Sequence, residues 1–249
     1  MTITLKNVGL TLDKLDILND VTATIADGSF VSLIAPSGAG KSTILKLLTG
    51  LLQPSMGTLA VDGHAITGLN TTFSYLPQED MLFPWYDVDQ NITLYQRINH
   101  QPIDQERVTE LLTICGLLPY RHFLPHQLSG GMRQRVALLR TMLNPANYRL
   151  LDEPFGALDA MTRGLMQDWL LGLPANLKRT TLLVTHDIEE AIYLSDRILV
   201  LSARPAHVVQ DIALTPAVRN RDWLAAQAPL KAEIYELLRA DSLASANPD

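Results

Sequence analysis

The feature that most constrains this chain is the segment APSGAGKST at residues 35–43. A mostly apolar run at residues 30–35 leads into it and predicts a strand that is buried on both faces of a sheet. Residues 41–51 follow as a helix-like segment, which Gly50 and Pro54 end. A buried strand, a loop of small residues and a helix, in this order, predict a phosphate-binding loop, or P-loop.

The chemistry expected of this loop is recognition of a nucleoside triphosphate. Small residues let backbone N–H groups turn toward phosphate oxygens, and the start of the helix adds partial positive charge. Lys41 is expected to reach the outer phosphates, and the Ser42 hydroxyl to ligate Mg²⁺. Ala35 stands where the pattern has glycine, and we expect a negative φ to suffice because this residue ends the strand. The residues expected to contact the nucleotide are Pro36, Ser37, Gly38, Ala39, Gly40, Lys41, Ser42 and Thr43.

The rest of the chain predicts an alternation of strands and helices. Alternating apolar residues indicate half-buried strands at residues 3–10 and 17–25. Residues 87–144 favour helix, with apolar residues at helical spacing at Val108, Leu111, Leu112 and Cys115. After Pro145, short strands that end at Leu151 or span 180–184 and 198–201 alternate with helices, which implies parallel crossovers.

The predicted fold class is therefore α/β. We expect a P-loop NTPase core of mostly parallel sheet flanked by helices, with an N-terminal antiparallel β part and a helical insertion lobe. The nucleotide-binding core should comprise residues 1–78 and 146–215, and the lobe residues 79–145. Residues 216–249 should form a C-terminal helical extension that packs on the core through Leu230, Ile234, Leu237 and Leu238.

Composition excludes several classes of protein. The 249 residues are 47% hydrophobic, which suffices for a sizeable core, and the net charge of −6 argues against a nucleic-acid binder. A single cysteine, Cys115, excludes an internal disulfide and fits a reducing compartment. The sequence has no apolar run of membrane-spanning length and no signal peptide. We therefore expect a cytoplasmic protein whose membrane role, if any, comes through a protein partner.

Two further segments narrow the function. Residues 148–154 predict a strand that ends in two carboxylates: Asp152 can hold Mg²⁺ through its water shell, and Glu153 can polarise an attacking water. Ser129, Gly130 and Gly131 open another helix and form a second anion-binding site. One nucleotide does not need two such helix ends, which favours two chains arranged head to tail.

On these residues the chain resembles the ATP-binding subunits of ABC transporters, over about residues 2–215. Residues 35–43 look like Walker A, and Asp152 and Glu153 look like Walker B and its catalytic glutamate. Residues 128–132 look like the ABC signature and residues 157–159 like the D-loop. Gln78 looks like the Q-loop glutamine and His186 like the switch histidine.

The resemblance implies an ATPase that needs ATP and Mg²⁺. Glu153, His186 and Gln78 are the implied catalytic residues, and Ser42, Gln78 and Asp152 the implied metal ligands. The implied partners are transmembrane permease subunits, a solute-binding protein and a second copy of this chain. The implied place is the cytoplasmic face of the inner membrane, reached through the permease, with no direct membrane insertion and no nucleic-acid partner.

Three positions depart from the family pattern. Leu12 stands where an aromatic residue usually stacks on adenine, so we expect apolar contact only, with weaker nucleotide affinity or looser base selectivity. Arg149 stands in a strand that is usually apolar, so it should lie before the buried part or be paired. Met132 replaces the commoner glutamine of the signature, but Ser129 and the glycine backbone keep the donors.

Residues 81–92, with Phe83 and Trp85, resemble the nitrate, sulfonate and taurine importers, and transporters of the pyrimidine precursor of thiamine share this pattern. The solute itself is not encoded in these residues. Phe83 and Trp85 could pack inside the lobe or line a pocket for the permease, and both interpretations stay open. Two alternative functions are a degenerate nucleotide-binding regulator and a soluble single-cassette ABC protein of translation or repair.

Overall fold

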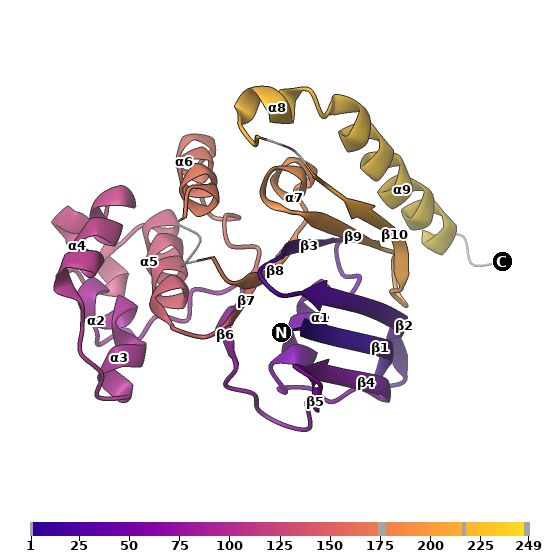
Figure 1. Ribbon diagram of the computed structural model, residues 1–249, viewed down its shortest axis with the longest axis horizontal. Coiled ribbons are helices and arrows are strands. Elements are labelled where there is room, and N and C mark those ends of the chain that lie inside the picture. The colour runs from indigo at the N-terminus through magenta and orange to yellow at the C-terminus, as the bar shows by residue number, and fades with distance from the viewer. Residues whose placement is uncertain (1, 174–177, 216–217, 247–249) are drawn as a thin grey trace.

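Two sheets form the centre of the protein in the computed structural model, which describes residues 2–173, 178–215 and 218–246 (Figure 1). One is antiparallel, with the strand order β2-β1-β4-β5, and the other has the order β10-β9-β3-β8-β7-β6. In the second sheet β10 is antiparallel to β9, and the other neighbours are parallel. The strands are β1 (Thr2–Leu12), β2 (Leu15–Ala26), β3 (Phe30–Ile34), β4 (Met56–Val61), β5 (His64–Ala65), β6 (Phe73–Leu76), β7 (Tyr148–Asp152), β8 (Thr180–Thr185), β9 (Arg197–Leu201) and β10 (Val208–Ala213).

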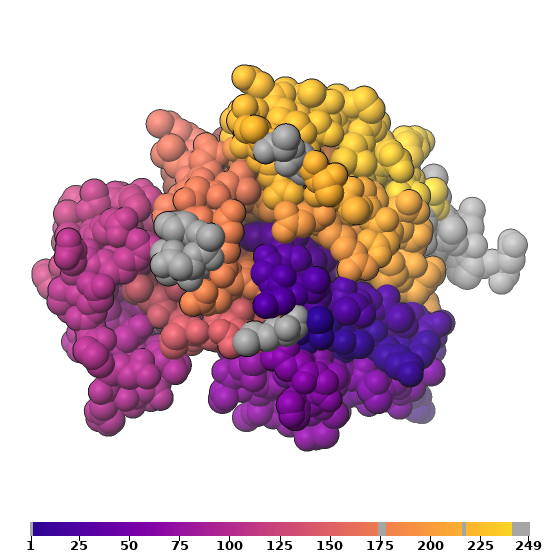
Figure 2. Space-filling view, in the orientation of Figure 1, coloured from indigo at the N-terminus to yellow at the C-terminus, as the bar shows by residue number. Residues whose placement is uncertain are grey.

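Helices cover the second sheet and build the lobe. The lobe lies at one end of the molecule, and the last helices cover another side (Figures 1 and 2). The helices are α1 (Lys41–Leu48), α2 (Val88–Ile92), α3 (Leu94–Ile98), α4 (Gln105–Ile114), α5 (Gly130–Leu143), α6 (Ala160–Leu171), α7 (Ile188–Leu194), α8 (Arg221–Ala225) and α9 (Ala228–Ala246), with 3₁₀ turns at Leu118–Tyr120 and Pro125–Gln127. These elements confirm the predicted α/β class.

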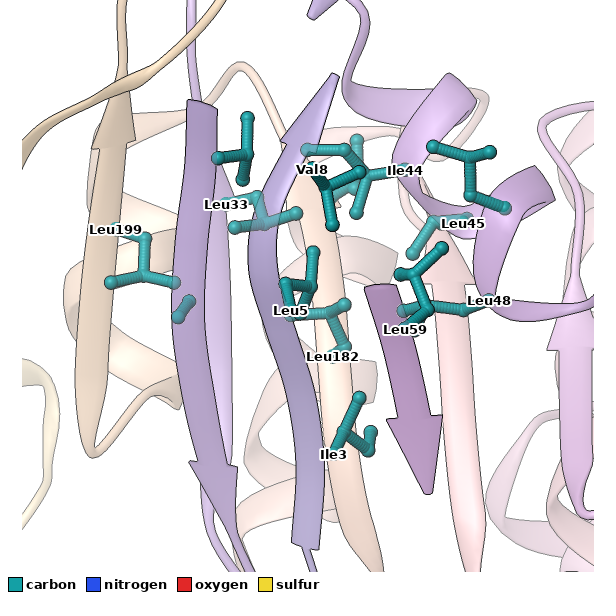
Figure 3. Close-up of a cluster of buried hydrophobic side chains, with 14 of the residues drawn as sticks. Ile3, Leu5, Val8, Leu33, Ile44, Leu45, Leu48, Leu59, Leu182 and Leu199 are labelled. Atoms are coloured by element: carbon teal, nitrogen blue, oxygen red, sulfur yellow. The ribbon is translucent and has the colours of Figure 1, made fainter. Parts of the chain in front are cut away.

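The central strands are buried on both faces because each face has its own apolar cover. On one face, Leu182 of β8 packs with the antiparallel sheet and α1, as Figure 3 shows for Ile3 and Ile44. Leu183, the next residue, faces the other way and joins the cluster formed by the lobe and α6. All six residues of β8, three of them threonines, are buried, as expected of a central parallel strand that is covered on both faces.

The terminal helix packs on the core as predicted. Ile234 is buried against β3, α7 and β9, and Leu230, Leu237 and Leu238 pack half-buried beside it. Residues 216–217 and 247–249 of the expected extension, and Met1 of the expected core, lie outside the described residues. No helix in the described part of the chain is both long and apolar enough to cross a membrane.

Helix α1 ends earlier than expected, at Leu48 instead of residue 51. The reason is Gly50, which has a φ of 74°. A Cβ built on Gly50 would lie 1.7 Å from the carbonyl oxygen of Gly68. Only glycine allows this left-handed conformation and this close backbone contact, so the chain turns away here.

Strands β6 and β10 were not predicted. β6 has only four residues, and β10 is an edge strand with mostly exposed residues, so neither has a periodicity that stands out in the sequence. β10 also pairs antiparallel at the edge of a parallel sheet. Pairing with β7 and β9 defines these strands, and that pairing is a tertiary property.

The structure decides between the two expectations for Arg149. This residue does not lie before the buried part of its strand, because all five residues of β7 are buried and Arg149 is 5% exposed. Its Nη2 donates to the carbonyl oxygen of Met142 at 3.4 Å. Burial, with a smaller effect of the Arg179 charge, lowers the pKa of Arg149 to about 10.

Candidate nucleotide-binding and hydrolysis site

The P-loop joins the end of β3 to the start of α1, as predicted. Gly38 and Gly40 both have positive φ, 78° and 105°. A Cβ on Gly40 would lie 2.9 Å from Cγ2 of Ile17, so glycine is required there for space as well as for conformation. Ala35 is not among the residues with positive φ, which fits the expectation that alanine is tolerated there.

The start of α1 is open to an anion. Gly40 is its N-cap and gives no side-chain cap, and the first turn contains no acidic residue. The first N–H groups of a helix have no intrahelical acceptor, and they carry partial positive charge. Phosphate oxygens can therefore take the place that a capping side chain fills in α4, α5 and α7.

Lys41 is anchored on the loop itself. Its Nζ donates to the carbonyl oxygens of Ala35 at 2.8 Å and Pro36 at 3.1 Å. Burial lowers the pKa of Lys41, while the charges of Glu153 and Asp152 act in the opposite direction. The buried ammonium keeps a further N–H donor, and it lies where it can bind a phosphate oxygen held by the loop.

Ser42 and Asp152, both expected to hold Mg²⁺, lie together. The Ser42 hydroxyl donates to Oδ1 of Asp152 at 3.0 Å. Asp152 is 2% exposed, and burial raises its pKa against the effect of the Ser42 hydrogen bond. A buried carboxylate beside a hydroxyl oxygen fits a hard divalent cation, because these are the ligands that Mg²⁺ prefers and the cation compensates the buried charge.

Glu153 and His186 also lie together, although 33 positions separate them in the sequence. Nδ1 of His186 lies 3.2 Å from Oε1 of Glu153. The parallel pairing of β7 and β8 places Asp152 opposite Val184, so both strands end at the same edge of the sheet. Glu153 has a φ of 49° and donates its N–H to the carbonyl oxygen of Val184 at 2.8 Å. This left-handed conformation costs a non-glycine residue about 1 kcal/mol or more and is typical of functional positions.

A chain of contacts ties the D-loop to the switch histidine. Arg163 of α6 donates to the carbonyl oxygen of Leu158 at 3.2 Å and lies 3.3 Å from Oδ2 of Asp187. Oδ1 of Asp187 accepts from the Glu190 N–H at 3.1 Å and thereby caps α7. Neither Arg163 nor Glu190 was predicted from the sequence. Asp187 followed three residues later by Glu190 is a helix-start pattern, which could have indicated Glu190.

Glu190 is a buried carboxyl group of α7, four residues after His186. It is 5% exposed, and its Oε2 accepts from the Thr185 hydroxyl. Burial raises the pKa of Glu190 to about 7, and the charges of Asp187 and Glu153 add to this shift. The Thr185 hydrogen bond and the Arg163 charge act in the opposite direction. A titratable group therefore lies next to the residues that are expected to sense the γ-phosphate.

The signature residues lie apart from the P-loop. Ser129 caps α5 by accepting from the Met132 N–H at 3.2 Å. A Cβ on Gly131 would lie 3.2 Å from the carbonyl oxygen of Ala157, so the signature packs against the D-loop of its own chain. No contact recorded for the described residues joins Ser129, Gly130 or Gly131 to residues 35–43.

Gln78 and Leu12 are both exposed. Gln78 follows β6 and lines an open groove together with Gly130, Arg133 and Ala157. Leu12 is 39% exposed at the end of β1, where it pairs with Leu15. Neither side chain has a recorded contact with the P-loop within the described residues, so their expected roles stay predictions.

An aromatic surface lies on the lobe after Gln78. The ring centroid of Phe83 lies 5.4 Å from Trp85 and 5.8 Å from Tyr86, and Trp85 is 67% exposed. Asn91, fully buried, holds this loop: its Oδ1 accepts from the Phe83 N–H, and its Nδ2 donates to the carbonyl oxygens of Phe83, Tyr86 and Asp87. Phe83 is half-buried beside the rings of Trp85 and Tyr86, while Trp85 is presented to solvent on a loop that Asn91 holds.

Comparison with known proteins identifies the family. The sequence matches the ABC transporter family over residues 18–156. It is 42% identical over 227 residues, 90% of each chain, to the aliphatic sulfonates import ATP-binding protein SsuB 1 of Xanthomonas axonopodis pv. citri (strain 306). It is 43% identical over 230 residues, 92% of this chain and 90% of the relative, to the protein of that name from Rhodococcus jostii (strain RHA1).

The fold is also similar to solved cassettes. The dimeric structure of MJ0796, a bacterial ABC transporter cassette, matches with a TM-score of 0.75 and 30% identity, covering 86% of this chain and 99% of that chain. A dimeric post-hydrolysis structure of MJ0796 bound to ADP and Pi matches with the same TM-score, the same coverage and 28% identity. The chain belongs to the ABC transporter family, and it is an ATPase coupled to transport.

Proposed function

We propose that this chain hydrolyses ATP to drive a membrane importer for aliphatic sulfonates or for a related small solute such as taurine, nitrate or hydroxymethylpyrimidine. The identity to two sulfonate importers over nine-tenths of the chain favours the sulfonate. The observation that carries the ATPase part is the meeting of the Ser42–Asp152 pair and the Glu153–His186 pair at one edge of the sheet.

The proposed chemistry follows from this arrangement. Pro36 to Thr43 bind the phosphates, and Ser42, Asp152 and Gln78 hold Mg²⁺, which neutralises charge on the phosphates. Glu153 contacts His186 through one oxygen, so its other oxygen can accept a proton from the attacking water. In its doubly protonated form, His186 donates through Nδ1 to Glu153 and through its second ring nitrogen to the γ-phosphate.

We propose that the working unit is a homodimer with two nucleotides between the chains. The support is that Ser129, Gly130 and Gly131 open a helix away from the P-loop of their own chain, and that the MJ0796 neighbours are dimers. ATP then drives the cycle because it binds the closed dimer more tightly than the open one.

The lobe is the proposed contact with the permease. The exposed Trp85, on the loop held by Asn91, supplies an apolar surface of the kind that protein partners bury. In this arrangement the chain lies on the cytoplasmic face of the inner membrane through its permease, and a solute-binding protein delivers the solute. We also propose the division into core 1–78 and 146–215, lobe 79–145 and extension 216–249.

The decisive experiment compares the wild-type chain with Glu153→Gln. We expect the variant to bind MgATP, to lose turnover, and to shift from monomer to dimer with MgATP in light scattering on a sizing column. Full turnover in the variant would contradict the role of Glu153. Absence of turnover in the wild-type chain, alone and with its permease, would favour the degenerate regulator.

A second experiment addresses the solute. ATP-dependent uptake is measured in vesicles that contain the chain, its permease and its binding protein, with an aliphatic sulfonate, taurine, nitrate or hydroxymethylpyrimidine as substrate. Uptake of the sulfonate alone is the expected result. A chain that associates with ribosomes or DNA instead of a permease would favour the soluble single-cassette alternative.

A further inference from the structure

The turn between β9 and β10, residues 202–207, is held rigidly. The Ser202 hydroxyl donates to the carbonyl oxygen of Ala203 at 2.8 Å and accepts from the His207 N–H at 2.9 Å. The Ser202 N–H donates to the carbonyl oxygen of His207 at 2.9 Å. One buried side chain and one backbone bond thus close the turn, so a residue inside it has a defined position.

The turn is also attached to β2, which packs against the P-loop. The Ala206 N–H donates to the carbonyl oxygen of Ile17, and the Asn19 N–H donates to that of Ala206, both at 2.9 Å. Ile17 and Leu18 in turn lie against Gly40, since a Cβ there would be 2.9 Å from the first and 3.1 Å from the second. The turn, β2 and the P-loop therefore form one packed unit.

Arg204 extends from this turn to the P-loop. Its Nη2 donates to the carbonyl oxygen of Gly38, and the residue is exposed. No carboxylate among the described residues lies within ion-pair distance of Arg204. Its charge is thus available to the loop, unlike that of Arg197 at the start of β9, which pairs with Asp211.

The contact matters because it bears on the orientation of the peptide between Gly38 and Ala39. The carbonyl of Gly38 and the N–H of Ala39 belong to one peptide plane and point in opposite directions. With the carbonyl held by Arg204, the Ala39 N–H points to the carbonyl oxygen of Pro36, at a long 3.3 Å. Of the two torsions that set this orientation, ψ of Gly38 is the less restricted because glycine has no Cβ, and the Arg204 hydrogen bond holds it.

We propose that Arg204 is a positioning residue of the P-loop, which holds the Gly38 carbonyl outward so that the Ala39 N–H faces the phosphates. This inference rests on the proposed function of residues 35–43. A phosphate oxygen replaces the weak contact with Pro36, and the guanidinium adds positive charge beside the loop. The chain gains affinity at the phosphate end of a nucleotide for which Leu12 offers no aromatic stacking.

The test measures binding of two probes, MgATP and inorganic tripolyphosphate, each by displacement of a fluorescent ATP analogue. The variants are Arg204→Ala, Arg204→Gln and Arg204→Lys. The control is Arg239→Ala, which removes an exposed arginine of α9 that lies 3.6 Å from Glu236, away from the P-loop. Melting temperatures show that the variants are folded.

We expect Arg204→Ala to weaken both probes by a similar factor of about tenfold, the scale of a partly exposed charge-assisted hydrogen bond. Arg204→Lys should restore more than half of this loss on a logarithmic scale, because it keeps a charged donor. Arg204→Gln should restore less. The turnover number at saturating ATP should stay within about twofold of the wild type, since Arg204 does not touch the reacting atoms.

Three results would overturn the proposal. One is unchanged affinity in Arg204→Ala, and another is an equal loss in Arg239→Ala. The third is a loss for MgATP that is absent for tripolyphosphate, because Arg204 would then act on the adenosine. Failure of the wild-type chain to bind either probe would contradict the nucleotide site itself, so the two hypotheses fail in different ways.

Discussion

Replacing Glu190 by glutamine should stabilise the protein at alkaline pH. Burial raises the pKa of Glu190 to about 7 in the folded state, against the ordinary value of 4.5 for a glutamate in the unfolded chain. The folded state therefore holds a proton that the unfolded state has lost between these two values. Stability due to this group is complete below about pH 4.5 and is lost as the pH rises through about 7.

The magnitude follows from the same shift. A difference of about 2.5 units, from 4.5 to about 7, corresponds to about 3 kcal/mol at pH 8, at about 1.4 kcal/mol per unit. Glutamine is neutral at every pH, and its carbonyl oxygen can accept the Thr185 hydroxyl that Oε2 accepts now. The groups that face Glu190 are Thr185, Asp187, Arg163 and Glu153.

The assay is urea unfolding of the wild type and Glu190→Gln at pH values from 5 to 9. The free energy of unfolding of the variant should rise relative to that of the wild type as the pH increases from 5 to about 7. The difference should then level off at about 3 kcal/mol by pH 8. Glu106→Gln, on the exposed side of α4, is the control for loss of a carboxylate. Parallel pH curves for the wild type and Glu190→Gln, or a relative gain of the wild type toward pH 8, would refute the reasoning.

Three further predictions concern binding, coupling and stability. Leu12→Tyr should tighten MgATP binding, since base stacking is worth about 1–3 kcal/mol; a titration that shows no change would contradict the adenine contact. Phe83→Ala combined with Trp85→Ala should abolish uptake in permease vesicles and leave nucleotide affinity intact, and intact transport would show that these rings only pack within the lobe. Gly50→Ala should lower the free energy of unfolding by more than about 2 kcal/mol, because its Cβ would lie 1.7 Å from the Gly68 oxygen. Gly63→Ala is the control and should lower it by less, because the space around Gly63 is open. Equal losses for the two variants in urea unfolding would contradict this account.

The elements that were predicted correctly are those that a local run of residues specifies. Residues 35–43 specify a strand end, a turn and a helix start within nine positions, and glycine is required there for steric reasons. The mostly apolar run at residues 30–35 predicted a strand that is buried on both faces, and four of the five residues of β3 are buried. Such features depend on neighbours in the sequence, so they can be inferred before any long-range contact is known.

The contacts that tune the site come from segments far apart in the sequence. Arg204 binds Gly38 although 166 positions separate them in the sequence, and nothing in the sequence around either residue indicates this contact. The pKa of Glu190 depends on burial by elements on both sides of α7, and the position of Arg149 inside its strand depends on what covers β7. None of these has a periodic or local signature.

The amino-acid sequence alone determined the fold class, the phosphate loop, the paired carboxylates and the helix start at Ser129, because sterics and hydrogen bonding impose those patterns locally. The tertiary structure decided which of these groups meet. Parallel pairing of β7 with β8 brings Glu153 to His186, and packing of the β9–β10 turn on β2 brings Arg204 to the P-loop. Burial and proximity depend on how the whole chain packs, so only the folded chain reveals them.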